Sequence, residues 1–428
     1  MVITKHPIVQ HTNENLAPPR DVTKLNIAYI MSRFPKLSET FVLYEMLALQ
    51  QQGVGVEVFP LISERANVIH QEAQQFVERA HYLPVISWPI LKAQFYFLRW
   101  RPAAYIGAWL EVLCGTFGSL NYMIGGLGIF PKAVRFAYDM SMSNVSHVHA
   151  HFANHPTVAA LVIHRLLGIP FSFTAHAHDI YVDQHMLAQK VHAAAFVVAI
   201  SDYNRELIVA RCGEDVREKV IVLHCGVDTG VFQPAKKESV TGPFTIVCIG
   251  SLEEKKGQTY LIEACRLLKE RNLDFICYLI GDGPMRSSLE EQIRRDQLEE
   301  TVRLVGGRPR DEVVRMLSQA DVVALPSIRT KSGKMEGIPV ALMEPLACGV
   351  PVVSTRISGI PELVEDGNTG LLVPPKDAVA LADALQRLAN DPELGRRLGL
   401  AGREKVLREF DLSNNTARLA QLIIGGMQ

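Results

Sequence analysis

The sequence predicts an α/β fold in which two doubly wound, Rossmann-like domains face each other across a cleft. Three observations lead to this prediction. The 428 residues exceed what one core usually holds. Short apolar runs of strand length alternate with helical stretches, as in parallel sheets with crossover helices. A polar stretch at residues 233–243 has no apolar face and divides these runs into two series, so we interpret it as an interdomain linker.

The first domain is expected at residues 25–232, after a polar, proline-containing arm at residues 1–24. Its first helix is expected at residues 41–51, where apolar residues recur with helical spacing until Gly53. Strands are predicted at residues 25–30, 56–59, 147–151, 171–174, 196–200 and 220–224. Together these runs predict one parallel sheet covered by helices.

The second domain is expected at residues 244–410. Its strands are predicted at residues 244–249, 275–280, 302–305, 322–325 and 350–354, each followed by a helix. A break at Phe410 and Asp411 precedes a last helix at about residues 413–424. Folds of this kind bind ligands beyond the carboxyl ends of their strands, so we expect the functional residues in the loops that follow the strands.

Composition excludes several classes of function. The net charge of −1 gives no bulk attraction to nucleic acid. The seven cysteines are scattered and never spaced as Cys-x-x-Cys, which argues against a disulfide framework and against a zinc site. Residues 1–24 lack the apolar core of a signal peptide. We therefore expect a cytoplasmic protein.

One segment departs from this pattern. Residues 103–130 contain a single charge, Glu111, and basic residues flank them on both sides. The segment is long enough to span a bilayer, but its glycines and Asn121 argue against one continuous helix. Three interpretations remain open: a membrane span, which is the least favoured, a peripheral contact with the inner face of the plasma membrane, or packing inside the protein.

Two glutamates, Glu336 and Glu344, stand eight positions apart around the start of a short apolar helix that Gly337 and Pro339 mark. With a rise of ~1.5 Å per residue they lie up to ~12 Å apart along the axis, beyond the ~5 to 9.5 Å between the paired carboxyls of glycosidases. We interpret them as binding two parts of one long ligand, with an anion site at the free N–H groups between them. The alternative is that both are solvated surface residues.

Four further loops are expected at the same edge of the second sheet, each of which taken alone is an ordinary turn. They comprise residues 249–257, 281–284, 306–308 and 326–334. Their glycines allow a close approach of backbone to a ligand. Their basic side chains, suited to a diphosphate, are Lys255, Lys256, Arg308, Arg329, Lys331 and Lys334.

Taken together, these motifs resemble the retaining glycosyltransferases of family 4, which have the GT-B fold. Residues 250–257, 281–284, 326–344, 347–353 and 361–373 match the pattern of that family. The resemblance implies that Lys256 holds the diphosphate of the donor, Glu336 the hydroxyls of the transferred sugar and Glu344 the ribose. It also implies that the backbone after Gly307 lies near the nucleobase, and that a C-terminal helix within residues 411–428 crosses back to the first domain.

The implied donor is a UDP-, GDP- or ADP-sugar. Its expected binding residues are Gly250, Ser251, Lys255, Lys256, Gly281, Gly283, Gly307, Arg308, Glu336, Gly337, Ile338, Val340 and Glu344. One of them departs from the family, because Ser251 replaces its usual arginine and so removes a fixed bidentate donor. Lys255, Arg329 or Lys331 would have to replace that arginine; otherwise we expect weak donor binding or impaired activity.

The first domain offers an acceptor side. The loop after the strand at residues 171–174 carries His176, His178 and Asp179 at the expected cleft. The resemblance places His176 against the donor sugar and phosphate; the alternative is a plain surface histidine.

A second loop on this side contributes Arg33, Lys36 and Glu39, and we expect Ser38 or Thr40 to cap the helix that follows. The sequence of this loop, S-R-F-P-K-L-S-E-T-F, resembles that of the bacterial exopolysaccharide glycosyltransferases of the colanic-acid type. The same is true of H-A-H-F-A and T-A-H-A-H-D-I-Y later in the chain. Those enzymes extend lipid-linked glycans, so the resemblance implies a glycan or lipid-linked glycan as acceptor.

A further cluster, His147, His149 and His151, lies on one face of a predicted strand and could bind a metal. The sequence near it offers no carboxylate or cysteine set, so we expect neither a metal nor another cofactor.

The expected reaction is retaining sugar transfer by front-face substitution, with His176, Glu336 and Lys256 as the catalytic residues. In this scheme the leaving phosphate takes the proton of the acceptor while Lys256 stabilises its charge. Two alternatives stay open. Ser251 favours a sugar-nucleotide-binding protein of low or no activity, and the fold also accommodates epimerases and phosphorylases, whose motifs fit poorly.

Overall fold

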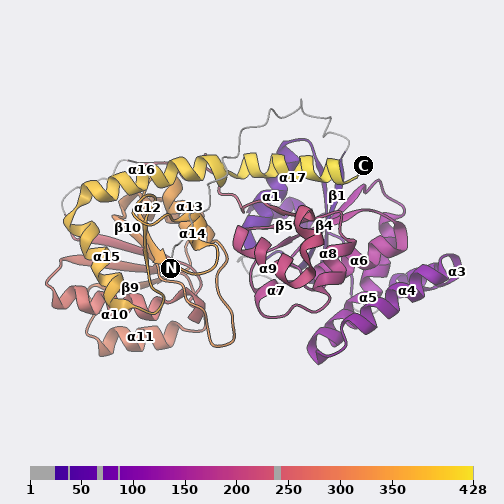
Figure 1. Cartoon of the computed structure of the whole chain (residues 1–428), viewed down its shortest axis with the longest axis horizontal. Helices are drawn as coiled ribbons and strands as arrows, with labels where there is room; N and C mark the ends of the chain where they lie inside the picture. Colours follow the sequence, from indigo (N-terminus) through magenta and orange to yellow (C-terminus); the bar gives the residue numbers. More distant parts are fainter. Residues whose placement is uncertain (1–24, 37–38, 65–70, 85–86, 236–241, 428) are drawn as a thin grey trace, which may run out of the picture.

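A computed structural model describes residues 25–36, 39–64, 71–84, 87–235 and 242–427, which form two α/β domains side by side (Figure 1). The expected N-terminal arm and residues 236–241 of the expected linker lie outside the described residues. Each domain contains a parallel six-stranded sheet with helices on both faces. The predicted fold class is therefore confirmed.

The first sheet has the strand order β2-β1-β3-β4-β5-β6. Its strands are β1 (Asn26–Phe34), β2 (Gly55–Ser63), β3 (His147–His151), β4 (Phe171–Ala175), β5 (Phe196–Ala199) and β6 (Val220–Val222). β1 and β2 run longer than predicted because their pairing continues beyond the apolar run, as far as Phe34 opposite Ser63. Arg33, expected in a loop, therefore lies in β1 opposite Ile62.

The helices of the first domain cover both faces of this sheet. They are α1 (Thr40–Gln51), η3 (Gln71–Ala73), α2 (Gln74–Val77), α3 (Trp88–Trp100), α4 (Pro102–Gly115), α5 (Leu120–Met140), α6 (His155–Leu167), α7 (His178–Tyr181), α8 (Leu187–Ala193), α9 (Asp202–Cys212) and η4 (Glu214–Lys219). One buried apolar cluster joins α5 and α6 to one face, and another joins α1 and α2 to the other face. The alternation of side chains along the strands sends successive residues into these two cores.

The second sheet has the order β12-β11-β10-β7-β8-β9. Its strands are β7 (Phe244–Ile249), β8 (Phe275–Ile280), β9 (Val302–Gly306), β10 (Val322–Leu325), β11 (Val352–Thr355) and β12 (Leu371–Val373). Its helices are η5 (Glu254–Lys256), α10 (Gln258–Glu270), α11 (Arg286–Arg295), α12 (Arg310–Gln319), α13 (Val340–Ala347), α14 (Ile360–Leu363), α15 (Ala378–Asn390) and α16 (Pro392–Glu409). A single apolar cluster forms the core of this domain.

The last helix, α17 (Leu412–Gly426), returns to the first domain, which confirms the expected crossover (Figure 1). The chain breaks at Phe410 between α16 and α17, at the predicted place. Val227 fixes this break, because its N–H donates to Phe410 and its carbonyl accepts from Leu412. The apolar face of α17 then packs into the same core as α1.

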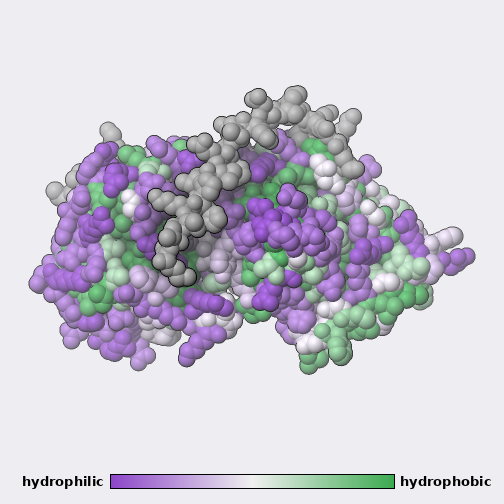
Figure 2. Space-filling model, viewed as in Figure 1, coloured by the Kyte–Doolittle hydropathy of each residue, from purple (hydrophilic) through white to green (hydrophobic). Residues whose placement is uncertain are grey.

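The apolar segment at residues 103–130 is not one helix. It forms most of α4 and the first half of α5, which are joined by a turn at residues 116–119. Among the described residues, no helix is both long and apolar enough to cross a bilayer. Figure 2 shows hydrophobic residues gathered on the surface where α4 and α5 lie.

Candidate functional site

The carboxyl ends of the two sheets meet where the loop before α13 touches the loop after β4. Gly337 lies so close to the first domain that a Cβ built on it would stand 2.8 Å from Ile200 Cδ1 and 3.4 Å from the His176 carbonyl oxygen. A side chain at Gly337 would therefore separate the two loops. The structure thus brings together Glu336, Gly337 and His176, which the sequence places 160 positions apart.

Glu336 is buried and holds two ammonium groups. Its Oε2 lies 3.0 Å from Lys256 Nζ, and its Oε1 lies 3.0 Å from Lys255 Nζ. The methylene chain of Lys256 passes over Gly250, where a Cβ would be 3.2 Å from Lys256 Cε. Lys255 Nζ also lies 3.8 Å from Oε2 of the more exposed Glu253. The two neighbouring ammonium groups could bind an anionic ligand that takes the place of these carboxylates.

Charge and burial shift the pKa values of this group. Burial alone would raise the pKa of Glu336, but the ammonium groups of Lys256 and Lys255 outweigh it and hold the pKa below its ordinary value. Burial likewise acts to lower the pKa of Lys255, and Glu336 reverses the effect so that the pKa rises. Glu336 is therefore ionised and Lys255 protonated at neutral pH.

Glu344 lies inside α13, as the sequence predicts, and differs from Glu336 in its electrostatics. Burial raises the pKa of Glu344 to about 7, against the opposing charges of Arg310 and Lys256. The charge of Lys256 thus acts on both glutamates. Unlike Glu336, the Glu344 carboxyl changes its charge near neutral pH.

Arg310, which the sequence did not single out, lies at the contact between the two domains. Its guanidinium stacks 4.3 Å from the ring centroid of Tyr44 on α1 and lies 3.3 Å from the Asp228 carboxylate. It therefore contacts the first domain from the start of α12. The neighbouring Arg308, which was expected at the site, is exposed and pairs with Glu312 at 3.3 Å. Nothing in the loop Gly306-Gly-Arg-Pro-Arg310 distinguishes the two arginines.

The glycines of the loops that were expected to bind the donor allow backbone segments to pack closely on one another. A Cβ on Gly281 would stand 2.1 Å from the Gly250 carbonyl oxygen, and one on Gly283 would stand 2.6 Å from that of Leu252. Between them, Asp282 accepts a hydrogen bond from the Gly307 N–H at 2.7 Å. The expected loops at Gly250, Gly281 and Gly307 are thus joined to one another. Their glycines are required by these contacts whether or not a ligand is bound.

Ser251 lies at this junction, half-buried, with its carbonyl accepting from Gln258. Arg329 and Lys331, two candidates to replace the missing arginine, are exposed. Lys255 is the third candidate, and it forms an ion pair with Glu336. The geometry therefore favours Lys255 as the replacement cation.

On the first domain, the carboxylate of Asp179 stabilises the loop after β4 and is not free to bind a ligand. It is buried and accepts hydrogen bonds from the N–H groups of Ala153, His176 and Ala177. The expected acceptor role of its side chain does not agree with this geometry, because both oxygens already serve backbone donors. His178 is exposed and so remains available on this side.

The His176 ring is buried against Phe41 and Phe152, and it ends a chain of hydrogen-bonded groups. Its Nε2 lies 3.1 Å from His151 Nδ1, and His151 Nε2 lies 3.0 Å from Glu45 Oε1. Burial, together with the neighbouring His151 and His178, holds the pKa of His176 well below its ordinary value. His176 is therefore a neutral imidazole whose tautomer is fixed by its neighbours.

Glu45, which the sequence analysis missed, supplies the carboxylate that His149 and His151 were expected to lack. Ligand atoms of these three residues lie within 4.8 Å of one another, which is close enough for a metal. The ring nitrogens of His149 are already hydrogen bonded to Ser172 and Thr174, however, and those of His151 to His176 and Glu45. The cluster is thus a satisfied hydrogen-bond network.

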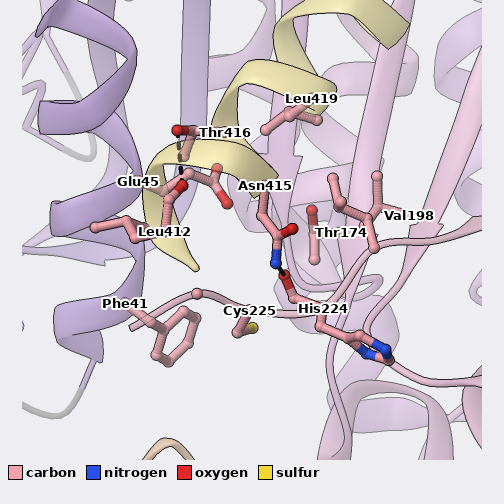
Figure 3. Close-up of a pocket in the computed structure, with 12 residues that line it drawn as sticks. Phe41, Glu45, Thr174, Val198, His224, Cys225, Leu412, Asn415, Thr416 and Leu419 are labelled. Carbon is pink, nitrogen blue, oxygen red and sulfur yellow. Dashed lines mark hydrogen bonds between the residues drawn. The ribbon is translucent and has the colours of Figure 1, made fainter. Parts of the chain in front are cut away.

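A small cavity lies beside this network, between α1, the loop after β6 and the start of α17 (Figure 3). Glu45 and Cys225 both line it, and Cys225 Sγ lies 3.9 Å from His176 Nδ1. Phe41 and Leu412 line the same cavity. The polar network around His176 therefore reaches the junction between α17 and the first domain.

Of the other acceptor-side residues, Lys36 and Glu39 form an ion pair at 2.5 Å, and Arg33 is exposed on β1. Ser38 lies outside the described residues. The expected cap at Thr40 is wrong, because Thr40 is the first helical residue and the N-cap position belongs to Glu39, whose side chain makes no capping hydrogen bond.

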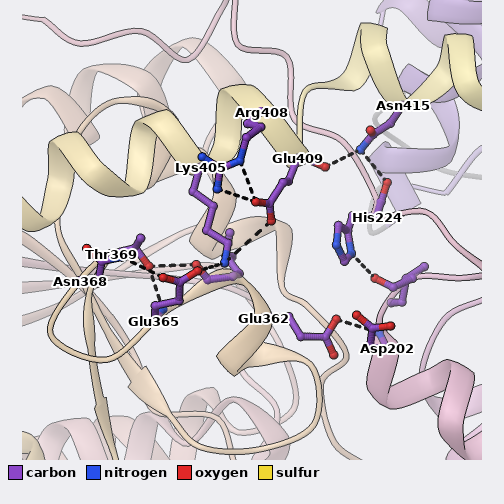
Figure 4. Close-up of polar contacts among 12 residues, drawn as sticks. Asp202, His224, Glu362, Glu365, Asn368, Thr369, Lys405, Arg408, Glu409 and Asn415 are labelled. Atoms are coloured by element: carbon purple, nitrogen blue, oxygen red, sulfur yellow. Dashed lines mark hydrogen bonds and ion pairs between the residues drawn. The ribbon is translucent and has the colours of Figure 1, made fainter. Parts of the chain in front are cut away.

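Polar contacts also join the domains beside the site (Figure 4). Glu362 of α14 accepts hydrogen bonds from the N–H groups of Asp202 and Tyr203 at the start of α9, at 2.8 and 2.9 Å. These N–H groups have no partner within their own helix. A carboxylate of the second domain thus caps a helix of the first, which holds the two loops of the site together.

Comparisons with known proteins agree with this geometry. Residues 232–405 match the family of glycosyl transferases group 1, and residues 117–231 match glycosyltransferase family 4. The chain is 32% identical over 418 residues to the colanic acid biosynthesis glycosyltransferase WcaL of Salmonella typhimurium, covering 93% of this chain and 99% of that protein. It is 44% identical over 208 residues to WcaL of Escherichia coli, a match that spans 48% of this chain and 51% of that protein.

The solved structures that resemble the chain share its fold. Anabaena HepE, crystallised in complex with UDP, aligns with a TM-score of 0.70 and 17% identity over 94% of this chain and 100% of that one. Sucrose-phosphate synthase from Thermosynechococcus elongatus aligns with a TM-score of 0.69 and 19% identity over 94% and 98% of the two chains. The chain therefore belongs to the group 1 and family 4 glycosyltransferases and has the GT-B fold.

Proposed function

We propose that the protein is a retaining glycosyltransferase that moves a sugar from a nucleoside-diphosphate sugar to a hydroxyl of a glycan in exopolysaccharide or cell-envelope polysaccharide biosynthesis. The observation that carries the proposal is the group formed by Glu336, Lys255 and Lys256 against the His176 loop. Its two neighbouring ammonium groups suit a diphosphate, and its carboxylate suits the hydroxyls of a sugar. The complexes of HepE with UDP and with UDP-glucose support a nucleotide-sugar donor.

In this proposal the phosphates of a bound donor replace Glu336 as the partner of the two ammonium groups. The leaving phosphate accepts hydrogen bonds from Lys256 and Lys255, and Glu336 turns to the hydroxyls of the sugar. Glu344 holds the ribose. The leaving phosphate then takes the proton of the acceptor as the new glycosidic bond forms on the same face, so most of the rate comes from positioning and charge stabilisation.

We propose that His176 orients the sugar and phosphate as a neutral group. A protonated imidazole would compete with Lys256 for the phosphate, whereas the neutral ring can accept or donate one directed hydrogen bond. No metal or other cofactor is part of the proposal, because both histidines of the nearby cluster already have hydrogen-bond partners on each ring nitrogen.

The proposed acceptor is a lipid-linked glycan, and the proposed location is the cytoplasm, at the inner face of the plasma membrane. Two observations support this choice. The WcaL proteins are named for colanic acid biosynthesis. A mannosyltransferase from Mycolicibacterium smegmatis, 32% identical over 241 residues, is named for a phosphatidylinositol acceptor; the match covers 54% of this chain and 63% of that protein.

A panel of UDP-, GDP- and ADP-sugars tests the proposal. Thermal shift and calorimetry should show one preferred nucleotide, and adding a membrane extract as acceptor should release the free nucleotide. Analysis of the product by NMR should give the same anomeric configuration as the donor. Failure of every donor to bind would remove the proposal, and an inverted product would contradict the retaining mechanism.

Ser251 supports a second candidate, a sugar-nucleotide-binding protein of low activity. In that case a donor would bind with ordinary affinity, but no acceptor extract would raise nucleotide release above hydrolysis. Replacing the serine by the family's arginine, Ser251→Arg, then provides a direct comparison. A large gain in turnover would show that the missing guanidinium limits the natural protein; an unchanged rate would show that Lys255 already fills that role.

A further inference from the structure

The surface of α3, α4 and the start of α5 is unusually apolar. We define the apolar helical surface by its exposed large side chains: Trp88, Leu91, Phe95, Tyr96, Leu98, Trp100, Ile106, Trp109, Leu110, Phe117, Leu120 and Ile124. They are 12 of the 21 large apolar side chains that are exposed among the described residues, and they fall within residues 88–124. Such concentration on one surface marks an interaction site rather than ordinary surface scatter.

The kind of side chain on this surface indicates its partner. All three tryptophans of the chain, Trp88, Trp100 and Trp109, belong to it, with 74%, 65% and 40% of their surface exposed. Tryptophan is enriched where a protein meets the boundary between lipid headgroups and acyl chains, because its ring is apolar and its N–H is polar. Exposed tryptophans on adjoining helices are typical of helices that lie in the plane of a membrane.

The charges agree with an anionic membrane. Residues 88–131 contain three cations, Lys92, Arg99 and Arg101, and one acid, Glu111. The acid is neutralised by Arg165, whose Nε lies 2.9 Å from it. A net positive apolar surface attracts acidic lipid headgroups. Two copies of the same surface would bring like charges together, which disfavours a symmetric dimer.

The surface is packed against the segment that follows the His176 loop. A Cβ built on Gly115, in the last turn of α4, would be 2.7 Å from Met186, and the ring of Tyr122 on α5 stacks on His185 at 5.5 Å. Lys190 Nζ donates to Tyr122 Oη at 2.8 Å. The segment that carries His185 and Met186 follows directly after α7, which begins at His178. The apolar helical surface and the His176 loop are therefore parts of one packed unit.

We propose that the apolar helical surface docks on a lipid bilayer with anionic headgroups, with α3, α4 and the start of α5 lying in the plane of the membrane. The tryptophans sit at the headgroup boundary, and Lys92 and Arg99 face the acidic lipids. This inference extends the proposed function from its acceptor class to the surface that meets the membrane. It also places the acceptor side of the cleft beside the lipid surface.

Tryptophan fluorescence tests the proposal directly, because every tryptophan of the chain reports on this surface. Mixed phosphatidylcholine and phosphatidylglycerol vesicles should shift the emission to the blue, and brominated lipids should quench it. Vesicles of phosphatidylcholine alone should bind at least ~10-fold more weakly, since each cation near an anionic surface contributes about 1 kcal/mol. Flotation should give the same order of binding.

A triple variant, Phe117→Ser, Leu120→Ser and Ile124→Ser, keeps all three tryptophans and changes side chains that are 81%, 70% and 64% exposed. It should fold normally and lose at least ~10-fold in vesicle partition. The matched control replaces exposed apolar residues of the second domain, Val379, Leu400 and Leu407, by serine. That control should bind vesicles like the natural protein.

Three results would overturn the proposal: no vesicle binding, equal binding by the triple variant, or a concentration-dependent dimer that buries the tryptophans without lipid. Light scattering identifies the last of these. The assay contains no sugar, so its failure leaves the proposed transfer reaction untouched. Conversely, a protein that binds vesicles but no nucleotide-sugar would retain this inference and lose the proposed function.

Discussion

The two sheet edges that meet at the site are held by different kinds of contact. In the second domain, the loops at the sheet edge meet through bare backbone, since Gly281 lies against Gly250 and Gly283 against Leu252. In the first domain, buried side chains hold the corresponding edge, and the chain from Glu45 through His151 to His176 draws on three separate elements. Backbone contacts leave a pattern of glycines in the sequence. A network of side chains from distant elements leaves no such pattern, so the sequence indicated His176 but not the chain of groups that holds it.

The largest effect is expected on the donor side, at Glu336. Glu336→Gln removes the charge that holds Lys255 and Lys256, so kcat/KM for the donor should fall at least ~100-fold, about 2.7 kcal/mol in transition-state stabilisation. Nucleotide release measures this fall, and circular dichroism checks the fold. Glu254→Gln, an exposed glutamate of the same loop, is the control and should keep its activity. Equal activities of the two variants would refute the role of Glu336.

An effect of similar size, on stability rather than on turnover, is expected at the glycine contacts. Gly281→Ala places a methyl group against the Gly250 carbonyl at a φ of +138°, and should lower the free energy of unfolding by about 2–4 kcal/mol. Denaturant titration measures the change. Gly107→Ala, in an exposed turn of α4 with nothing within 4 Å, is the control and should stay within about 1 kcal/mol of the natural protein. A Gly281→Ala variant as stable as this control would show that the loops adjust freely.

On the acceptor side, Glu45→Gln should lower kcat by about 10-fold with little change in KM, because it weakens the fixed orientation of His151 and thereby of His176. The ¹⁵N shifts of the His176 ring should report a mixture of tautomers. Glu57→Gln removes a carboxylate that lies 3.3 Å from His81 in the same domain, and should leave both the rate and the ring unchanged. If Glu45→Gln behaves like this control, the network serves only to fold the domain.

The smallest effect concerns pH. Burial raises the pKa of Glu344 to about 7, so its carboxyl is neutral below that pH and ionised above it. A raised pKa contributes stability that is present at low pH and is lost as the pH rises through 7. Ribose hydroxyls donate to a carboxylate, so nucleotide binding should tighten about 5-fold from pH ~6 to ~8. Glu344→Gln should flatten this dependence and the exposed Glu404→Gln should keep it, as calorimetry can show.

How much of the site the sequence predicts depends on the kind of contact. The sequence predicted that Glu336, Lys256 and the loop glycines share one sheet edge, because their spacing in the chain reflects a strand, a tight turn and a helix start; their roles stay predictions. Glu45 and Arg310 were missed because each acts through partners far away in sequence, such as His151, which is 106 positions from Glu45. Asp179 was placed correctly on its loop, but a backbone role cannot be distinguished from an acceptor role without knowing which N–H groups surround it.

The sequence by itself determined the two parallel sheets, the break before the last helix and the order of the donor loops, because apolar periodicity and turn residues act over a few neighbouring positions. Only the tertiary structure decided which groups of the two domains meet. Gly337 reaches the His176 carbonyl and Glu362 caps α9 because two domains close on each other. It also decided that residues 103–130 fold back as two helices, since the turn at residues 116–119 and the packing of α4 and α5 on α6 set their path.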